Sequence, residues 1–178
     1  MLDLNGDGIH TTGLPGPVWF DLDGDGTKEH ITWTNPSTME GFLWVNLTGK
    51  NRVDNGTELF GTGTVMPDGS TAADGFQALA VYDRPEHGGN GDGVIDARDA
   101  IWDSLRVWID TNHDGVCDPW ENRPLRAYGV ESISLAAALN GTVDAAGNVH
   151  HLSGRFSRRE RGVVTTGLVE SLIFQRIR

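Results

Sequence analysis

The sequence contains little that would support covalent cross-linking or membrane insertion. Cys117 is the only cysteine, so no disulfide can form within the chain. No apolar run approaches the roughly 18 residues of a transmembrane helix, and Met1-Leu2-Asp3 lacks the basic and apolar regions of a signal peptide. We therefore expect no membrane insertion. Cys117 is interpreted as a small buried hydrophobe and not as a reactive thiol.

Basic residues are scarce as well, because 14 Lys and Arg stand against 25 Asp and Glu, for a net charge of −11. Nucleic-acid binding needs clustered positive charge, so this class is excluded. The six His form neither an HExxH motif nor a triad-like set, and the glycines form no Walker or Rossmann loop. We expect no catalytic residue in the chain. A hydrophobic content of 38% with six Trp indicates a folded module, and we expect a monomer.

The most constrained motif lies at 110–121, where the sequence matches every position of the D-x-[DN]-x-[DN]-G-x5-E calcium loop. Calcium takes six to eight oxygen ligands, and the glycine at the sixth position allows the sharp turn that brings them together. The plainer alternative is an acidic, solvated loop. The expected ligands are Asp110, Asn112, Asp114, the Val116 carbonyl, Asp118 and Glu121.

Two related loops occur in the first thirty residues. The second one closes early with an acid at its ninth position, and its expected ligands are Asp21, Asp23, Asp25, the Thr27 carbonyl and Glu29. The first has Leu14 at the twelfth position, so it needs a closing ligand from elsewhere or is only an Asp-Gly turn. Its expected ligands are Asp3, Asn5, Asp7 and the Ile9 carbonyl.

A fourth loop spans 90–99 but lacks its first ligand in register. Asp83 can supply that ligand only if residues 84–89 bulge outward. The expected ligands are Asp83, Asn90, Asp92, the Val94 carbonyl, Asp96 and Asp99. Together the four loops hold more than half of the acidic residues, so we expect several Ca²⁺ ions to fold or tighten the protein.

Residues 46–58 resemble a decayed loop in which Asn46, Thr48, Asp54 and Glu58 offer oxygen but Lys50 stands at a ligand position. Two readings remain open. Lys50 replaces the ion with its own charge, or the two acids serve a neighbouring loop. We favour the absence of a metal at this loop.

The pattern of apolar residues predicts one α+β module over 1–178, divided into three parts. Residues 1–60 are expected to form short β-hairpins with Asp/Gly calcium loops, 61–128 a paired EF-hand-like helical region, and 129–178 strands ending in a C-terminal β-hairpin of 148–156 and 168–174. The predicted helices rest on Phe76, Leu79 and Ala80, on Ile101, Trp102, Leu105, Trp108 and Ile109, and on the stretch from Glu121 to Tyr128.

Two packing expectations follow from this arrangement. Ile95 and Cys117 share the eighth loop position and are expected to meet between the paired loops. The basic cluster of the tail is expected to be a solvated edge near the hairpin connection, with docking of the acidic half or of an anionic partner as alternatives. This cluster consists of Arg155, Arg158, Arg159 and Arg161.

Six ordered blocks over about residues 2–135 give the chain a family resemblance. They are Leu2-Asp-Leu-Asn-Gly-Asp-Gly8, Phe20-Asp-Leu-Asp-Gly-Asp-Gly26, Asn55-Gly-Thr-Glu-Leu-Phe-Gly61, Gly91–Ala100, Leu105-Arg-Val-Trp-Ile-Asp110 and Val130-Glu-Ser-Ile-Ser-Leu135. The chain resembles the calcium-binding self-processing module of iron-regulated RTX proteins and related EF-hand-like modules of large bacterial surface and repeat proteins. In the self-processing relatives, calcium folds the module, which then promotes cleavage of an upstream Asp-Pro bond and can link the freed aspartyl group to a lysine.

Two functions therefore stand side by side. The first is a non-catalytic calcium-binding module of a larger secreted or cell-surface, adhesin-like bacterial protein, with the flanking domains of that protein as its partners. The alternative is calcium-triggered cleavage of an upstream Asp-Pro bond. Because the chain opens directly on a calcium-type motif, we expect it to be a segment of a longer protein. The internal Asp118-Pro119 bond lies inside the best loop, where we expect it to be held intact.

Overall fold

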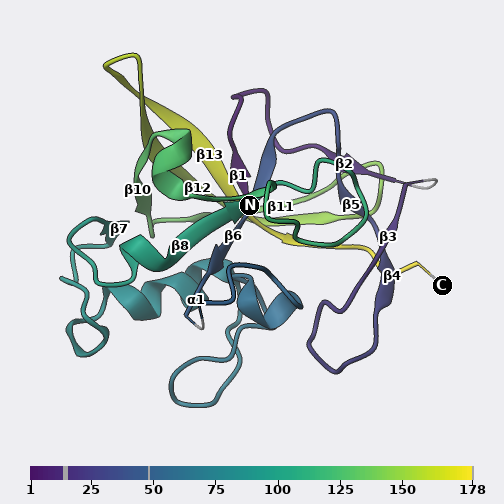
Figure 1. Cartoon of the computed structure of the whole chain (residues 1–178), viewed down its shortest axis with the longest axis horizontal. Coiled ribbons are helices and arrows are strands. Elements are labelled where there is room, and N and C mark those ends of the chain that lie inside the picture. The colour runs from purple at the N-terminus through teal and green to yellow at the C-terminus, as the bar shows by residue number, and fades with distance from the viewer. Residues whose placement is uncertain (14–15, 48, 178) are drawn as a thin grey trace.

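The computed structural model describes residues 1–13, 16–47 and 49–177 and is predominantly β (Figure 1). Its main sheet is built from nine strands: β1 (Leu2–Asp3), β6 (Glu40–Val45), β7 (Val94–Asp96), β8 (Leu105–Trp108), β9 (Asn122–Pro124), β10 (Val130–Ser134), β11 (Ala138–Val143), β12 (Val149–Glu160) and β13 (Val163–Ile173). The strand order is β7-β10-β12-β13-β1-β6-β8-β9, and β11 pairs with β12 beside β10. All pairings in this sheet are antiparallel.

The longest element of the sheet is the β12–β13 hairpin, which pairs from Val149↔Ile173 to Glu160↔Val163. It projects as a yellow-green ribbon in Figure 1. Its turn contains Arg161 and Gly162, both with positive φ, as expected for a two-residue hairpin loop. The predicted C-terminal hairpin is therefore confirmed, and β10 lies in the 129–178 part that was predicted to form strands.

Two small sheets flank the main one near the C-terminal end of the chain. One pairs β2 (Thr11–Thr12) with β5 (Trp33–Thr34), and the other pairs β3 (Val18–Phe20) with β4 (Glu29–Ile31). They cover an aromatic core in which the ring of Trp33 lies 4.7 to 5.7 Å from its neighbours. Those neighbours are Phe20, Phe42, Trp108 and Phe174.

A second core lies on the other side of the main sheet, under the helical segment. It contains Leu2, Phe76, Ile95, Ile133 and Phe156 among other apolar residues. Within the described parts of the chain, α1 (Gly75–Ala80) is the one α-helix, and the side chain of Asp74 caps it by accepting from the amides of its first turn. None of the helices in these parts is long and apolar enough to cross a membrane.

Short 3-10 helices occupy the remaining turns. They are η1 (Gly56–Glu58), η2 (Val81–Asp83), η3 (Pro85–His87), η4 (Trp102–Ser104) and η5 (Leu125–Tyr128). Leu14 and Thr48, which entered the loop predictions, lie outside the described residues.

The predicted α+β fold with paired EF-hand helices is wrong. Residues 101–109, expected to form the shared middle helix, are η4 followed by strand β8. Leu105 and Val107 face one core while Trp108 faces the other, so the apolar residues serve both faces of a sheet. A strand buried on both faces and a buried helix cannot be distinguished by their apolar residues alone. The β-branched and aromatic residues of this stretch favour the strand.

The helix predicted from Glu121 to Tyr128 is also wrong, because strand β9 and η5 occupy that stretch. Pro124 cannot donate the backbone hydrogen bond that the interior of a helix requires. Ile95 and Cys117 do not meet. Ile95 pairs with Ile133 across β7 and β10 in one core, whereas Cys117 is buried in the aromatic core.

Candidate metal centre

Four acidic loops share one backbone design. In each, the first Asp is buried and one of its carboxylate oxygens accepts the amide N–H of the glycine that precedes the seventh loop position. The pairs are Asp3–Gly8 at 3.0 Å, Asp21–Gly26 at 3.1 Å, Asp83–Gly93 at 2.9 Å and Asp110–Gly115 at 2.8 Å. All four glycines have positive φ, which a side chain would oppose. Each loop therefore wraps around its first carboxylate.

The 110–121 loop is anchored by buried acids at both ends. Asp110 is 1% exposed and Glu121 is 2% exposed. Glu121 folds back over the loop, where its Oε1 accepts from the amides of Thr111 at 2.7 Å and Asn112 at 3.2 Å. This back-folding brings the twelfth position of the loop against its start, as a closing ligand requires.

Two tryptophans of the aromatic core hold these anchors. Trp33 Nε1 donates to Asp110 Oδ2 at 2.8 Å, and Trp108 Nε1 donates to Glu121 Oε2 at 3.3 Å. Both indoles are fully buried, so the carboxylates they contact are fixed by the packing of the core.

Negative charge in this loop is not compensated. Burial raises the pKa of Asp110, with a further contribution from Glu121, and burial, Glu121 and Asp114 raise the pKa of Asp118. Among the described residues, no basic side chain forms an ion pair with the acids of this loop. A hard divalent cation would relieve this repulsion, and the donor set consists of the oxygens that such a cation prefers.

The 83–99 loop contains the outward bulge that the sequence required. The inserted residues form η3, and Asp83 reaches across them so that its two oxygens accept from Gly91 at 3.1 Å and Gly93 at 2.9 Å. At the other end, buried Asp99 accepts from the amides of Asn90 at 3.3 Å and Asp96 at 2.8 Å. Asp83 and Asp99 therefore occupy the first and last positions of the loop, as Asp110 and Glu121 do in the 110–121 loop.

A cation of the protein already stands in this loop. The guanidinium of Arg98 lies 2.6 Å from Asp92 and 2.7 Å from Asp96, two of the predicted ligands. These contacts lower the pKa of Asp96. Calcium would have to share these two carboxylates with the guanidinium or displace it.

The 21–29 loop has the same arrangement. Ligand oxygens of Asp21, Asp23 and Glu29 lie within 4.8 Å of one another, and Glu29 Oε2 accepts the amide of Leu22 at 2.8 Å. Arg176 reaches in from the C-terminal segment, 2.7 Å from Asp23 and 3.4 Å from Glu29. Its hydrogen bond lowers the pKa of Asp23.

A distant strand brings an acidic side chain to the first loop. Glu40 on β6 is 1% exposed, is paired with Asp3 in the β1–β6 register, and accepts the amide of His10 at 3.0 Å. Ligand atoms of Asp7, His10 and Glu40 lie within 4.8 Å of one another. Burial raises the pKa of Glu40. Sequence reasoning missed Glu40 because no local spacing connects it to a loop more than thirty residues away.

The decayed loop is filled by lysine. Lys50 Nζ lies 2.6 Å from Asp54 and 3.6 Å from Glu58, and the hydrogen bond that Lys50 donates to Asp54 raises the pKa of the lysine. Of the two readings left open, the structure supports the one in which Lys50 provides the charge. Arg158 of the tail cluster donates to the carbonyl of Leu4, so this arginine docks the first acidic loop.

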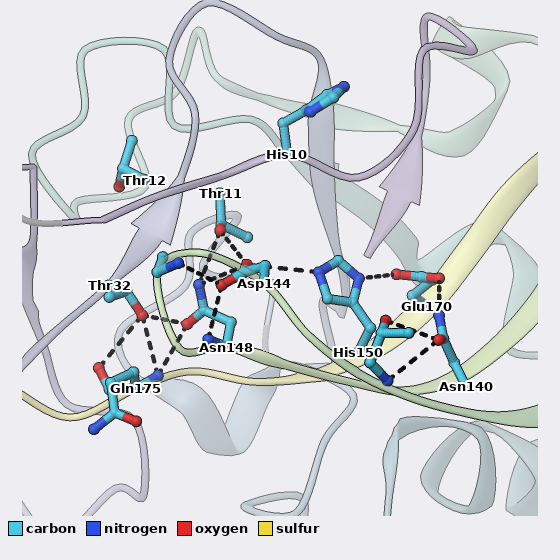
Figure 2. Close-up of polar contacts among 12 residues, drawn as sticks. His10, Thr11, Thr12, Thr32, Asn140, Asp144, Asn148, His150, Glu170 and Gln175 are labelled. Atoms are coloured by element: carbon cyan, nitrogen blue, oxygen red, sulfur yellow. Dashed lines mark hydrogen bonds and ion pairs between the residues drawn. The ribbon is translucent and has the colours of Figure 1, made fainter.

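A fifth acidic turn, centred on Asp144, escaped sequence reasoning (Figure 2). Asp144 Oδ1 accepts from the amides of Ala146 and Asn148, and its Oδ2 accepts from Thr11 Oγ1 at 2.5 Å. His150 lies between this carboxylate, 3.5 Å away, and Glu170, 2.5 Å away. In the sequence this turn could have been recognised from its Asp-x-x-Gly-Asn pattern. Its carboxylate is hydrogen-bonded to polar groups of the protein itself.

Comparisons with known proteins identify the family of this chain. Residues 1–174 match the family model described as the SPM domain. The chain is 42% identical over 137 residues to the iron-regulated protein FrpA of Neisseria meningitidis serogroup C, an alignment that covers 76% of this chain and 12% of FrpA. The chain thus spans only a small part of that relative. With nearly all of its length inside the family match, this chain belongs to the SPM domain family of self-processing modules.

Proposed function

We propose that this protein is a calcium-binding module that takes up several Ca²⁺ ions and is stabilised by them. The observation that carries the proposal is the 110–121 loop, where the buried carboxylates of Asp110 and Glu121 accept from backbone amides of the loop. No basic side chain of the described chain forms an ion pair with the acids of this loop. Binding to the folded state alone stabilises it by about 2.7 kcal/mol when free calcium is a hundredfold above the dissociation constant.

The basic side chains that contact the loops predict the order in which the loops bind calcium. The 110–121 loop takes calcium first because no basic side chain of the described chain forms an ion pair with its acids. The 21–29 and 83–99 loops follow, since Arg176 and Arg98 occupy part of their charge. The 3–9 loop depends on Glu40 for closure. All four use oxygen donors, and calcium should be preferred over Mg²⁺, which resists full dehydration.

Calorimetric titration of metal-free protein with Ca²⁺, followed by circular dichroism and thermal unfolding, tests the proposal. We expect more than one ion per chain and a large rise in the melting temperature. Asp110→Asn should remove the tightest site, whereas Asp103→Asn, at an exposed position outside the loops, should not. Unchanged thermal unfolding in excess chelator, with metal removal verified by elemental analysis, would refute the proposal.

We further propose a role in self-processing, which the family match and the relation to FrpA favour. In this reaction an aspartyl acyl group upstream of the module is transferred from the proline nitrogen to water or to a lysine amine, and the proline leaves as an amine that takes up the proton. The module would then act as part of a longer secreted or surface protein, with the flanking domains as its partners. Calcium added to such a longer chain should yield fragments that mass spectrometry assigns to a cut at an Asp-Pro bond before residue 2. A longer chain that contains this bond and stays intact in calcium would exclude this role.

A further inference from the structure

The backbone of Met1 is already part of the main sheet. Its nitrogen donates to the carbonyl of Glu170 at 2.6 Å, and the amide of Glu170 donates to the carbonyl of Met1 at 2.9 Å. Leu2 pairs with Val169 on one side and with Gly41 on the other. The start of β1 therefore lies in the middle of the sheet, where Figure 1 places the N-terminus between β6 and β13.

A groove continues the line of β1 beyond Met1. One wall is the end of β13 and the residues after it, 170–174, and the other is the loop 59–63. Leu22 and Phe42 also line it. Its free volume of about 90 Å³ is several times the roughly 10–15 Å³ that one water molecule needs, so one water does not fill it.

The wall formed by β13 has a free backbone edge. Backbone groups of alternate residues point to the same side of a strand, so Leu172 faces the groove just as Glu170 faces Met1. On its other side, β13 is paired with β12 through His150↔Leu172 and Val149↔Ile173. Within the described parts of the chain, no strand pairs with the groove side of β13 beyond Met1.

The buried amino group of Met1 also fits a polypeptide better than a chain end. Burial lowers the pKa of this group to about 5. A peptide N–H at the same place would donate the same hydrogen bond to the Glu170 carbonyl without bringing a charge into the protein.

We propose that the groove binds the residues that precede Met1 in a longer protein, as an extended segment that continues β1 antiparallel to residues 171–173. In this register the second residue before Met1 lies opposite Leu172 and exchanges backbone hydrogen bonds with it. The segment passes beside Glu170 and between β13 and the loop 59–63. The inference rests on the proposed function as a module of a longer chain, and it deepens that function because it would hold an upstream cleavage site in a defined, extended geometry.

The test compares chain 1–178 with the same chain carrying four added residues, Ser-Thr-Val-Thr, before Met1, both in calcium. We expect the amide of Leu172 and that of the added valine opposite it to exchange at least tenfold more slowly with deuterium than the Leu172 amide in the chain 1–178 and the valine amide in a free peptide, respectively. Nuclear Overhauser contacts between the two residues should accompany this protection. Extension amides that exchange at free-peptide rates would overturn the proposal, since backbone pairing is its central claim.

A groove-filling variant provides the matched control. Gly61 lines the groove, and a Cβ at this position would meet no atom within 4 Å, so Gly61→Leu should fold and yet remove the protection. Ala73→Leu, at an exposed position away from the groove, should leave the protection intact. Equal protection in the two extended variants would also overturn the proposal. So would concentration-dependent protection of Leu172 in the chain without added residues, because it would identify a second copy as the occupant.

Calcium titration of the same samples keeps the two conclusions separate. Normal calcium-dependent folding with an unprotected extension would leave the calcium proposal standing and remove only the groove inference. Loss of calcium binding with a protected extension would remove the calcium proposal and leave the groove inference standing.

Discussion

The indole of Trp33 donates a hydrogen bond of 2.8 Å to Asp110, which joins the centre of the aromatic core to the first position of the 110–121 loop. Both side chains are almost completely buried. The loop is thus an extension of the core, and its geometry depends on residues nearly eighty positions away in the sequence.

Trp33→Phe should weaken calcium binding at the 110–121 loop and destabilise the calcium-loaded protein. A hydrogen bond to a charged group contributes about 1.5–3 kcal/mol, so we expect the affinity of this loop to fall by roughly tenfold or more. Calorimetry and urea unfolding measure the two effects. Trp19→Phe, at a residue that is 57% exposed, is the control and should change neither.

Arg98→Gln should increase calcium affinity at the 83–99 loop. The guanidinium contacts Asp92 and Asp96 but is largely exposed, so its competition with calcium is worth about 0.2–1 kcal/mol, or up to fivefold in affinity. Arg155→Gln removes the same charge at an exposed site outside the loops. A decrease in affinity would show that Arg98 supports the loop and does not compete for it.

The buried Met1 amine should make the stability of chain 1–178 depend on pH. Its pKa is about 5 in the folded protein and near 8.0 in the unfolded chain, so between these values the unfolded state binds more protons. Stability is full above pH 8 and is lost as the pH falls from 8 to 5. Urea unfolding across this range, with and without N-terminal acetylation, should show that acetylation flattens the curve. Parallel curves would contradict the burial of this group.

Cys117 should be unreactive while the protein is folded. The thiol is buried in the aromatic core, and burial raises its pKa to about 11. Reaction with a chromogenic disulfide reagent at pH 8 should be slow in calcium and faster by orders of magnitude in chelator plus denaturant. Fast labelling of the calcium-loaded protein would show that the 110–121 loop opens in solution.

Calcium alone should leave the internal Asp118-Pro119 bond of chain 1–178 intact. The amide of Glu121 donates to the carbonyl of Asp118 at 3.0 Å, which holds this peptide within the loop. Mass spectrometry after prolonged incubation in calcium provides the measurement. A fragment ending at Asp118 would identify an internal cleavage site.

Much of the candidate site could be read from the sequence because its information is local. The spacing of carboxylates around Gly26 and Gly115 defines a loop that wraps its own first Asp, whatever the flanking structure. Asp83 could also be predicted locally, because it becomes the first residue of the 90–99 loop once residues 84–89 are assumed to bulge outward. The family resemblance was likewise carried by short ordered blocks, and the family match confirms its self-processing module part.

The tertiary structure decided what spacing alone leaves open. Whether residues 105–109 form a helix or a strand depended on which surfaces were available to bury both faces, and β6 and β9 provided them. The tertiary contacts of Glu40, Arg176 and Trp33 with the loops have no local signature, because they join residues that are far apart in the sequence and come together only in the folded chain. The sequence by itself thus determined the type of loop and its candidate ligands, and the fold determined which distant side chains contact each loop.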